Sequence, residues 1–216
     1  MCVLPLKVSE IFFSLQGEAS RMGKPTAFIR LTGCPLRCRW CDSAYAFTGG
    51  APMSIEAILA ALRPYPTRQV CLTGGEPLAQ KSAFPLMTSL ADAGYEVALE
   101  TSGALPIHAV DPRVSRIVDI KPPSSGEADK NLWENLDSLN SQDEVKIIIA
   151  DRADYEWARA VLHDYPALVR RCPVWFSPAE PGQDARTLAE WILADGLSAR
   201  LQIQLHKVLW GNMRGK

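Results

Sequence analysis

Apolar runs rich in β-branched residues alternate along the chain with segments whose apolar residues recur at helical spacing. The runs predict strands at 27–31, 69–73, 96–100, 116–120, 145–149, 174–177 and 201–205. The helical spacing predicts helices at 54–62, 84–93, 155–164 and 187–195, with a less regular one near 131–139. In 187–195, for example, Leu188, Trp191 and Ile192 share one face, as expected of a helix that packs on a core.

The alternation of strands and helices indicates the fold class. Repeated strand–helix units form parallel sheets with helices outside them. A closed eightfold barrel typically needs about 250 residues, and this chain of 216 residues has too few units. We therefore expect an α/β fold in which residues 1–216 form a single domain built as an open partial barrel.

Polar and glycine-rich segments follow several of the predicted strands. They are the cysteine-containing loop after 27–31, then 73–77, 100–103 and 119–123. Turns favour Gly, Ser and Pro, so each segment taken alone is consistent with an ordinary turn. In parallel α/β folds, however, ligands bind at the carboxyl ends of the strands. The recurrence of such segments at one edge therefore predicts a binding site there.

Three cysteines, Cys34, Cys38 and Cys41, lie on one short loop. A cubic 4Fe–4S cluster normally takes four thiolates, so three would leave one iron open to a substrate or cofactor. A structural zinc site needs four ligands. The other cysteines are isolated from one another: Cys2, Cys71 and Cys172. A catalytic zinc with three thiolates remains an alternative, although the H-x-E and P-C-x-x-C pattern of zinc deaminases is absent.

Composition and charge narrow the function classes. Hydrophobic residues make up 47% of the chain, charged residues 22%, and the formal net charge is −1, values that are ordinary for a globular enzyme. Lys and Arg are scattered, so a nucleic-acid partner is not expected. No apolar run approaches a membrane span, and the first residues do not resemble a signal peptide. We expect a cytoplasmic protein, because a reducing compartment keeps thiols free.

The spacing C-x3-C-x2-C is similar to the signature of radical SAM enzymes, and Gly74-Gly75-Glu76-Pro77 resembles their GGEP motif. The flanking sequence resembles a narrower group, the 7-carboxy-7-deazaguanine synthase (QueE) family. The matching segments are 14–18, 28–34, 41–43, 100–103, 121–126 and 205–212. Together they extend over nearly the whole chain, which makes the combination more specific than any one motif.

The resemblance implies a reaction, cofactors and partners. Members of the family convert 6-carboxy-5,6,7,8-tetrahydropterin into 7-carboxy-7-deazaguanine with loss of ammonia, in the biosynthesis of queuosine and related 7-deazapurines. They are lyases that use a 4Fe–4S cluster, S-adenosyl-L-methionine (SAM) and Mg2+. SAM is cleaved to a 5′-deoxyadenosyl radical and is afterwards regenerated. The resemblance also implies a homodimer and an electron donor such as flavodoxin or ferredoxin.

The resemblance also carries site residues onto this sequence. The cluster ligands are Cys34, Cys38 and Cys41, and Ser43 offers Mg2+ the hard oxygen ligand that it prefers. The implied SAM contacts are Trp40, Cys41, Asp42, Gly75, Glu76, Gly103, Asp119, Ile120, Lys121 and Ser177. The implied substrate contacts are Leu15, Gln16, Gly17, Glu18, Arg30, Thr101 and His206. Arg30 suits the substrate carboxylate because a guanidinium binds carboxylates bidentately.

Some positions depart from common members of the family. Ala19 stands where some members have glycine, which should stiffen the loop after Glu18. Ser43 replaces threonine but keeps the hydroxyl, so we expect Mg2+ dependence to persist. Asp119 stands in place of a serine, which changes what that side chain can offer SAM.

Two other functions stay open on the sequence alone. An activase of a glycyl radical enzyme shares the cysteine spacing and a small size, but it would act on a protein backbone and consume SAM. Arg30 and the segment 15–17 suit a small acid instead. A non-enzymatic iron–sulfur or zinc module would bind metal and a partner protein, and it would not bind SAM.

Overall fold

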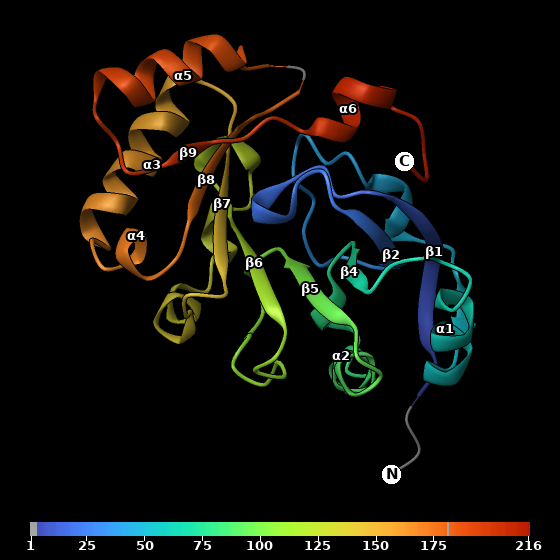
Figure 1. Cartoon of the computed structure of the whole chain (residues 1–216). Coiled ribbons are helices and arrows are strands. Elements are labelled where there is room, and N and C mark those ends of the chain that lie inside the picture. Colours follow the sequence, from blue (N-terminus) through green and yellow to red (C-terminus); the bar gives the residue numbers. More distant parts are fainter. Residues whose placement is uncertain (1–3, 181) are drawn as a thin grey trace.

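The computed structural model describes residues 4–180 and 182–216, which form one open sheet of nine strands (Figure 1). The strand order is β3-β1-β2-β4-β5-β6-β7-β8-β9. The strands are β1 Leu6–Leu15, β2 Pro25–Leu31, β3 Ala51–Met53, β4 Gln69–Gly74, β5 Glu96–Thr101, β6 Ser115–Ile120, β7 Glu144–Ile149, β8 Val174–Pro178 and β9 Arg200–Leu201. β1 is antiparallel to β2 and β3, and every pair from β2 to β9 is parallel.

Helices cover the outer side of the curved sheet (Figure 1). They are α1 Ile55–Leu62, α2 Ala83–Asp92, α3 Arg152–Asp164, α4 Leu168–Arg171 and α5 Ala185–Ala194. Ser54, Asp151 and Asp184 each accept a hydrogen bond from a backbone N–H in the first turn of α1, α3 and α5. Such caps satisfy donors that would otherwise lack partners, and they explain where these helices begin.

The hydrophobic core lies between the sheet and these helices. Ile29 and Leu31 of β2 are fully buried, as are Leu86 and Leu90 of α2. Burying a side chain of this size contributes about 1.5–3 kcal/mol. Since successive side chains of a strand point to opposite faces, Arg30 points to the inner face of the sheet when its neighbours point to the core. The core packing therefore decides which side chains face the inside of the partial barrel.

The predicted α/β class with an open partial barrel is confirmed. β3 and β9 end the strand order and do not pair with each other in the described residues. The strands predicted between 27 and 177 correspond to β2, β4, β5, β6, β7 and β8, and the regular helical patterns correspond to α1, α2, α3 and α5. That residues 1–216 form a single domain stays a prediction.

The strand predicted at 201–205 is wrong beyond its first residue. Only Arg200–Leu201 pairs with β8, and Leu205 begins helix α6, Leu205–Trp210. The Leu205 N–H donates to the Gly17 carbonyl at 3.0 Å, so the chain leaves the sheet and crosses to the loop after β1. Figure 1 shows α6 next to the C-terminus, which lies close to β1 and β2.

The helix predicted near 131–139 is a short 3-10 segment, Trp133–Ser138. Its buried Asn135 accepts a hydrogen bond from the Ile107 N–H and donates to the carbonyls of Gly103 and Leu105. These tertiary contacts, rather than an apolar stripe, fix the segment. The sequence pattern also gave no indication of β1 and β3.

No helix in residues 4–180 and 182–216 is long and apolar enough to span a membrane.

Candidate active site

A cavity of about 210 Å3 opens on the inner side of the sheet, at the carboxyl ends of the parallel strands. Most of the predicted site residues line it: Leu15, Gln16, Gly17, Glu18, Arg30, Cys34, Cys38, Trp40, Cys41, Asp42, Ser43, Gly75, Thr101, Asp119, Lys121, Ser177 and His206. They come from strands and loops over the whole length of the chain. The fold thus brings the predicted cluster, SAM and substrate residues to one cavity.

The three cysteines of the loop after β2 line this cavity as half-buried free thiols. The Arg37 guanidinium shapes their loop, because its Nη1 donates to the carbonyls of Cys34 at 2.8 Å and Leu36 at 2.7 Å. It also lies over the Phe47 ring at 4.3 Å. A second bond, from the Arg39 N–H to the Ser125 carbonyl at 3.1 Å, ties the loop to the segment after β6.

The three thiols suit an iron–sulfur cluster, because a cluster takes each thiolate on a different iron. Burial raises the pKa of the Cys34, Cys38 and Cys41 thiols, and the nearby Lys121 ammonium opposes that shift. Thiolates are the form that binds metal, so this cation favours the ligating state.

The glycines of the GGEP segment allow the loop after β4 to approach the cysteine loop. A Cβ at Gly75 would lie 2.2 Å from the Gly33 carbonyl oxygen and 2.9 Å from the Cys34 Cβ. Any side chain there would push the cysteine loop away. Gly75 therefore sets the distance between these two loops.

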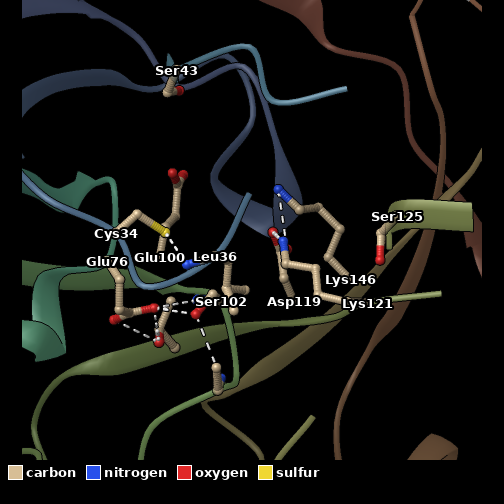
Figure 2. Close-up of polar contacts among 12 residues, drawn as sticks. Cys34, Leu36, Ser43, Glu76, Glu100, Ser102, Asp119, Lys121, Ser125 and Lys146 are labelled. Atoms are coloured by element: carbon tan, nitrogen blue, oxygen red, sulfur yellow. Dashed lines mark hydrogen bonds and ion pairs between the residues drawn. The ribbon is translucent and has the colours of Figure 1, made fainter. Parts of the chain in front are cut away.

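Glu76 is fully buried and does not line the cavity. Its carboxylate accepts hydrogen bonds from the Leu78 N–H at 2.8 Å, the Ser102 N–H at 2.6 Å, the Ser102 hydroxyl at 2.5 Å and the Thr101 hydroxyl at 2.9 Å (Figure 2). These bonds join the loop after β4 to the loop after β5. Glu76 therefore holds these two loops in position. A direct contact between Glu76 and SAM stays a prediction.

Two more of the predicted SAM residues lie outside the cavity lining, namely Gly103 and Ile120. Ile120 is 4% exposed and belongs to the hydrophobic core. The Gly103 carbonyl accepts from the Leu132 N–H at 3.1 Å and from Asn135 Nδ2 at 3.1 Å. Both positions can therefore reach the cavity only through their backbone.

A chain of buried charges forms one wall of the cavity (Figure 2). Lys146 Nζ lies 2.5 Å from Glu18 Oε2 and 3.3 Å from Asp119 Oδ1, and Lys121 Nζ lies 2.9 Å from Asp119 Oδ2. Gln204 Nε2 donates to Glu18 Oε1 at 2.7 Å. Burial opposes ionisation of Asp119, but Lys121 and Lys146 outweigh it and lower the pKa of that carboxyl.

Arg30 also lines the cavity and is fixed by its neighbours. Its Nε donates to Glu10 at 2.7 Å and its Nη1 to the Ser43 hydroxyl at 3.4 Å. The guanidinium also lies 5.8 Å from the Phe12 ring centre and 5.7 Å from the Tyr45 ring centre. Its remaining donors can bind an anion without losing this support, which is what recognition of a carboxylate requires.

Gly17 and His206 both line the cavity and contact each other although they lie at opposite ends of the sequence. A Cβ at Gly17 would lie 2.1 Å from His206 Nδ1, so only glycine lets the imidazole pack here. The sequence predicted both residues separately as substrate contacts, and the structure places them side by side.

Several lining residues were not predicted as site residues from the sequence, among them Glu100, Lys146, Gln204 and Lys216, whereas Lys207 was expected beside His206 at the substrate pocket and does line the cavity. Lys146 did carry a signal, because it is a charged residue inside the otherwise apolar run 145–149 of β7. Such a lysine is rarely buried unless it is paired. Gln204 and Lys216 offered no comparable signal, since Gln204 lies in the segment that was wrongly predicted as a strand and Lys216 follows the last predicted element.

Comparisons with known proteins agree with this geometry. Residues 28–119 match the model of the radical SAM superfamily. The chain is 44% identical over 209 residues to the 7-carboxy-7-deazaguanine synthase of Chlorobaculum tepidum, covering 95% of this chain and 94% of the relative. It is 43% identical over 219 residues to the synthase of the same name from Koribacter versatilis, covering 95% and 97%.

Solved structures show the same fold. The crystal structure of QueE from Escherichia coli superposes with a TM-score of 0.74 at 26% identity, covering 94% of this chain and 95% of that one. Streptococcus suis SuiB bound to S-adenosylmethionine gives a TM-score of 0.54 at 11% identity and covers 80% of this chain and 44% of SuiB, which supports the fold alone.

The three-cysteine loop on an open partial barrel defines a radical SAM enzyme, whose cofactors are a 4Fe–4S cluster and SAM. Sequence identity over nearly the full length goes further. The chain belongs to the 7-carboxy-7-deazaguanine synthase family.

Proposed function

We propose that this enzyme converts 6-carboxy-5,6,7,8-tetrahydropterin into 7-carboxy-7-deazaguanine with loss of ammonia. The observation that carries the proposal is the shared cavity. Its lining holds both a supported arginine, suited to a small carboxylic acid, and three thiols suited to a cluster. The relatives' name supports the same reaction.

On the substrate side, Arg30 would bind the carboxylate. Backbone groups of Leu15, Gln16 and Gly17 would pair with the pterin ring, with Thr101 and His206 beside them. Glu18 is already bound on both carboxylate oxygens, to Lys146 and Gln204, so its part would be to keep this wall rigid. A fixed wall lowers the entropy lost when the substrate is oriented.

On the cofactor side, Cys34, Cys38 and Cys41 would hold the cluster, and Trp40, Asp42, Gly75 and Ser177 would line the SAM site. Lys121 and Asp119 pair with each other at the cavity wall, so they present a nearly neutral, preorganised surface to SAM. The bound cluster and SAM together would supply the radical that removes a substrate hydrogen. The protein would fix the geometry and exclude water.

We also propose Ser43 as a ligand of Mg2+. Its hydroxyl donates to Asp42 Oδ1 at 2.8 Å and lies 3.4 Å from Arg30 Nη1. A cation at Ser43 would therefore stand beside the proposed carboxylate-binding arginine. Mg2+ is commonly bound by one or two protein oxygens together with water and substrate oxygens, which this corner of the cavity could provide.

The alternatives are less well supported. The chain matches relatives named 7-carboxy-7-deazaguanine synthase over nearly their whole length. No observation favours an activase of a glycyl radical enzyme. A metal-binding module without SAM is at odds with the radical SAM match. The homodimer and the flavodoxin- or ferredoxin-like electron donor remain proposals drawn from the family. The cytoplasmic location is also a proposal, supported by the free thiols of Cys71 and Cys172.

The test is an anaerobic reconstitution with the pterin, SAM, Mg2+ and a reductant, with product identification by mass spectrometry. About four irons per chain and a 7-carboxy-7-deazaguanine product are expected. Cys38→Ala should lose iron and product together. If wild-type protein cleaves SAM but leaves the pterin unchanged, the proposed substrate is wrong.

A further inference from the structure

Glu100, near the end of β5, lines the cavity beside the proposed substrate and cofactor residues. Its carboxylate is held by two neutral donors. Gln16 Nε2 donates to Oε1 at 3.2 Å, and the Thr73 hydroxyl donates to Oε2 at 2.9 Å. Because these donors come from the loop after β1 and from β4, the carboxylate is fixed in place before any ligand arrives.

Glu100 differs in its ion pairing from Glu18 and Asp119, two other carboxylates that line the cavity. Glu18 pairs with Lys146, and Asp119 pairs with Lys121 and Lys146. Within the described part of the chain, no Lys, Arg or His side chain forms an ion pair with Glu100. Glu100 is half-buried, and removing a carboxylate from water is costly to the extent that donors do not surround it. It has about four acceptor sites, so its two neutral bonds leave room for a ligand.

The position of Glu100 relative to Arg30 is set by the sheet. Arg30 is in register with Thr73, and Thr73 bonds to Glu100 on the next strand. Strands lie about 4.8 Å apart, so the two side chains begin about two strand spacings apart on one face. In Figure 2 the Glu100 side chain points toward the side where Ser43 lies, while Glu76 points toward Ser102. The cavity therefore has an anion-binding group and a separate group that binds N–H donors.

We propose that Glu100 binds the edge of the substrate ring where a ring N–H lies beside an exocyclic amino group. The two parallel N–H donors of such an amino-pyrimidinone edge match a carboxylate as a guanidinium does. Arg30 would bind the carboxylate at the other end of the same molecule. This proposal rests on the proposed function, and it makes Glu100 the residue that selects a 2-amino ring over a ring with oxygen in that place.

The test is equilibrium binding to anaerobic, cluster-loaded protein. Two ligands are compared: the 6-carboxy pterin and the matching 6-carboxy compound with oxygen in place of the 2-amino group. Wild-type protein should bind the oxygen analogue about 10- to 100-fold more weakly, the range expected for losing hydrogen bonds to a charged group. Glu100→Gln should bind the pterin weaker by a similar factor, and it should discriminate between the two ligands by about threefold or less.

Glu96→Gln is the matched control, because Glu96 lies on the same strand at the exposed end away from the cavity. It should bind both ligands as wild type does. SAM affinity should be unchanged in both variants, which shows that Glu100→Gln retains the cofactor site.

Three results would overturn the proposal: equal binding of the two ligands by wild type, unchanged pterin binding by Glu100→Gln, or a variant whose only defect is a raised Mg2+ requirement. The last would make Glu100 a metal ligand. The wild-type comparison needs no variant, so it decides the question even if Glu100→Gln does not fold. Wild-type protein that binds neither compound would contradict the proposed function itself, and this inference with it.

Discussion

At the scale of single residues, the cavity is built from side chains whose partners hold them in fixed positions. Arg30 is held by Glu10 and the two aromatic rings, and Lys146 is held by Glu18 and Asp119. Such preorganisation reduces the conformational entropy lost on binding. The consequence is that changes at these residues should alter binding or stability in separable ways.

Arg30→Ala should raise the KM for the pterin about 10- to 100-fold, because a charge-assisted bidentate contact to the carboxylate is lost. SAM binding should be unchanged. Steady-state kinetics and an anaerobic SAM-binding titration check this. Glu10→Gln is the control: it removes the support of Arg30 but keeps the guanidinium, so its KM effect should be smaller. Unchanged pterin kinetics in Arg30→Ala would rule out the carboxylate-binding part.

Lys146→Met should destabilise the protein by about 3–5 kcal/mol, since it leaves Glu18 without its buried partner. Adding Glu18→Gln should restore part of this stability, because the uncompensated charge is then removed. Denaturant unfolding of both variants measures the effect. If Lys146→Met unfolds at the wild-type midpoint, the lysine is not paired as the structure has it.

At the scale of elements, the strongly patterned strands and helices could be predicted from the sequence, and the irregular ones could not. β2 and β4 are short apolar runs with clear ends. α6 depends on contacts with the loop after β1, and Trp133–Ser138 depends on the bonds of Asn135. Interactions between distant segments leave no periodic signal in the chain.

The same limit applies to the site. Cysteine spacing and the GGEP segment predicted a cluster loop and a SAM loop, and both loops contribute residues to the cavity, because each motif is short and contiguous in sequence. The Glu18–Lys146–Asp119 wall joins three distant segments, and no local pattern could have revealed it.

The loop after β1 contains a backbone feature that a substitution can test. Ala19 has φ +58, a left-handed conformation that costs a non-glycine residue about 1–2 kcal/mol. Its methyl group is buried with Ala98 and Ile117. Ala19→Gly should relieve the strain but lose about 0.8 kcal/mol of burial and about 0.4–1 kcal/mol through a more flexible unfolded chain.

The free energy of unfolding of Ala19→Gly should therefore stay within about 1 kcal/mol of wild type, as these opposing terms nearly cancel. Ala98→Gly is the matched control in the same cluster, where no strain is relieved, and it should lose clearly more. Equal losses in the two variants, measured by denaturant unfolding, would mean that the left-handed backbone at Ala19 is not strained.

At the scale of the whole molecule, the buried charges make stability depend on pH. The pKa of Asp119 is lowered, since the two lysines outweigh burial. A carboxyl with a lowered folded pKa adds stability above its unfolded pKa, and that stability is lost as the pH falls through the folded value. The free energies of unfolding of wild type and Asp119→Asn should thus differ most near neutral pH and converge below about pH 4. A difference that stays constant down to acid pH would contradict the ion pairing.

Distant parts of the described chain meet at the cavity, since the first strand, the loops after the central strands and the last helix all contribute lining residues. The measurement that tests this account most directly is the number of 7-carboxy-7-deazaguanine molecules formed for each SAM consumed, in anaerobic protein with cluster, Mg2+ and reductant. We expect many products per SAM, because SAM is regenerated in the proposed cycle. One 5′-deoxyadenosine for each SAM consumed, with no deazaguanine formed, would contradict it.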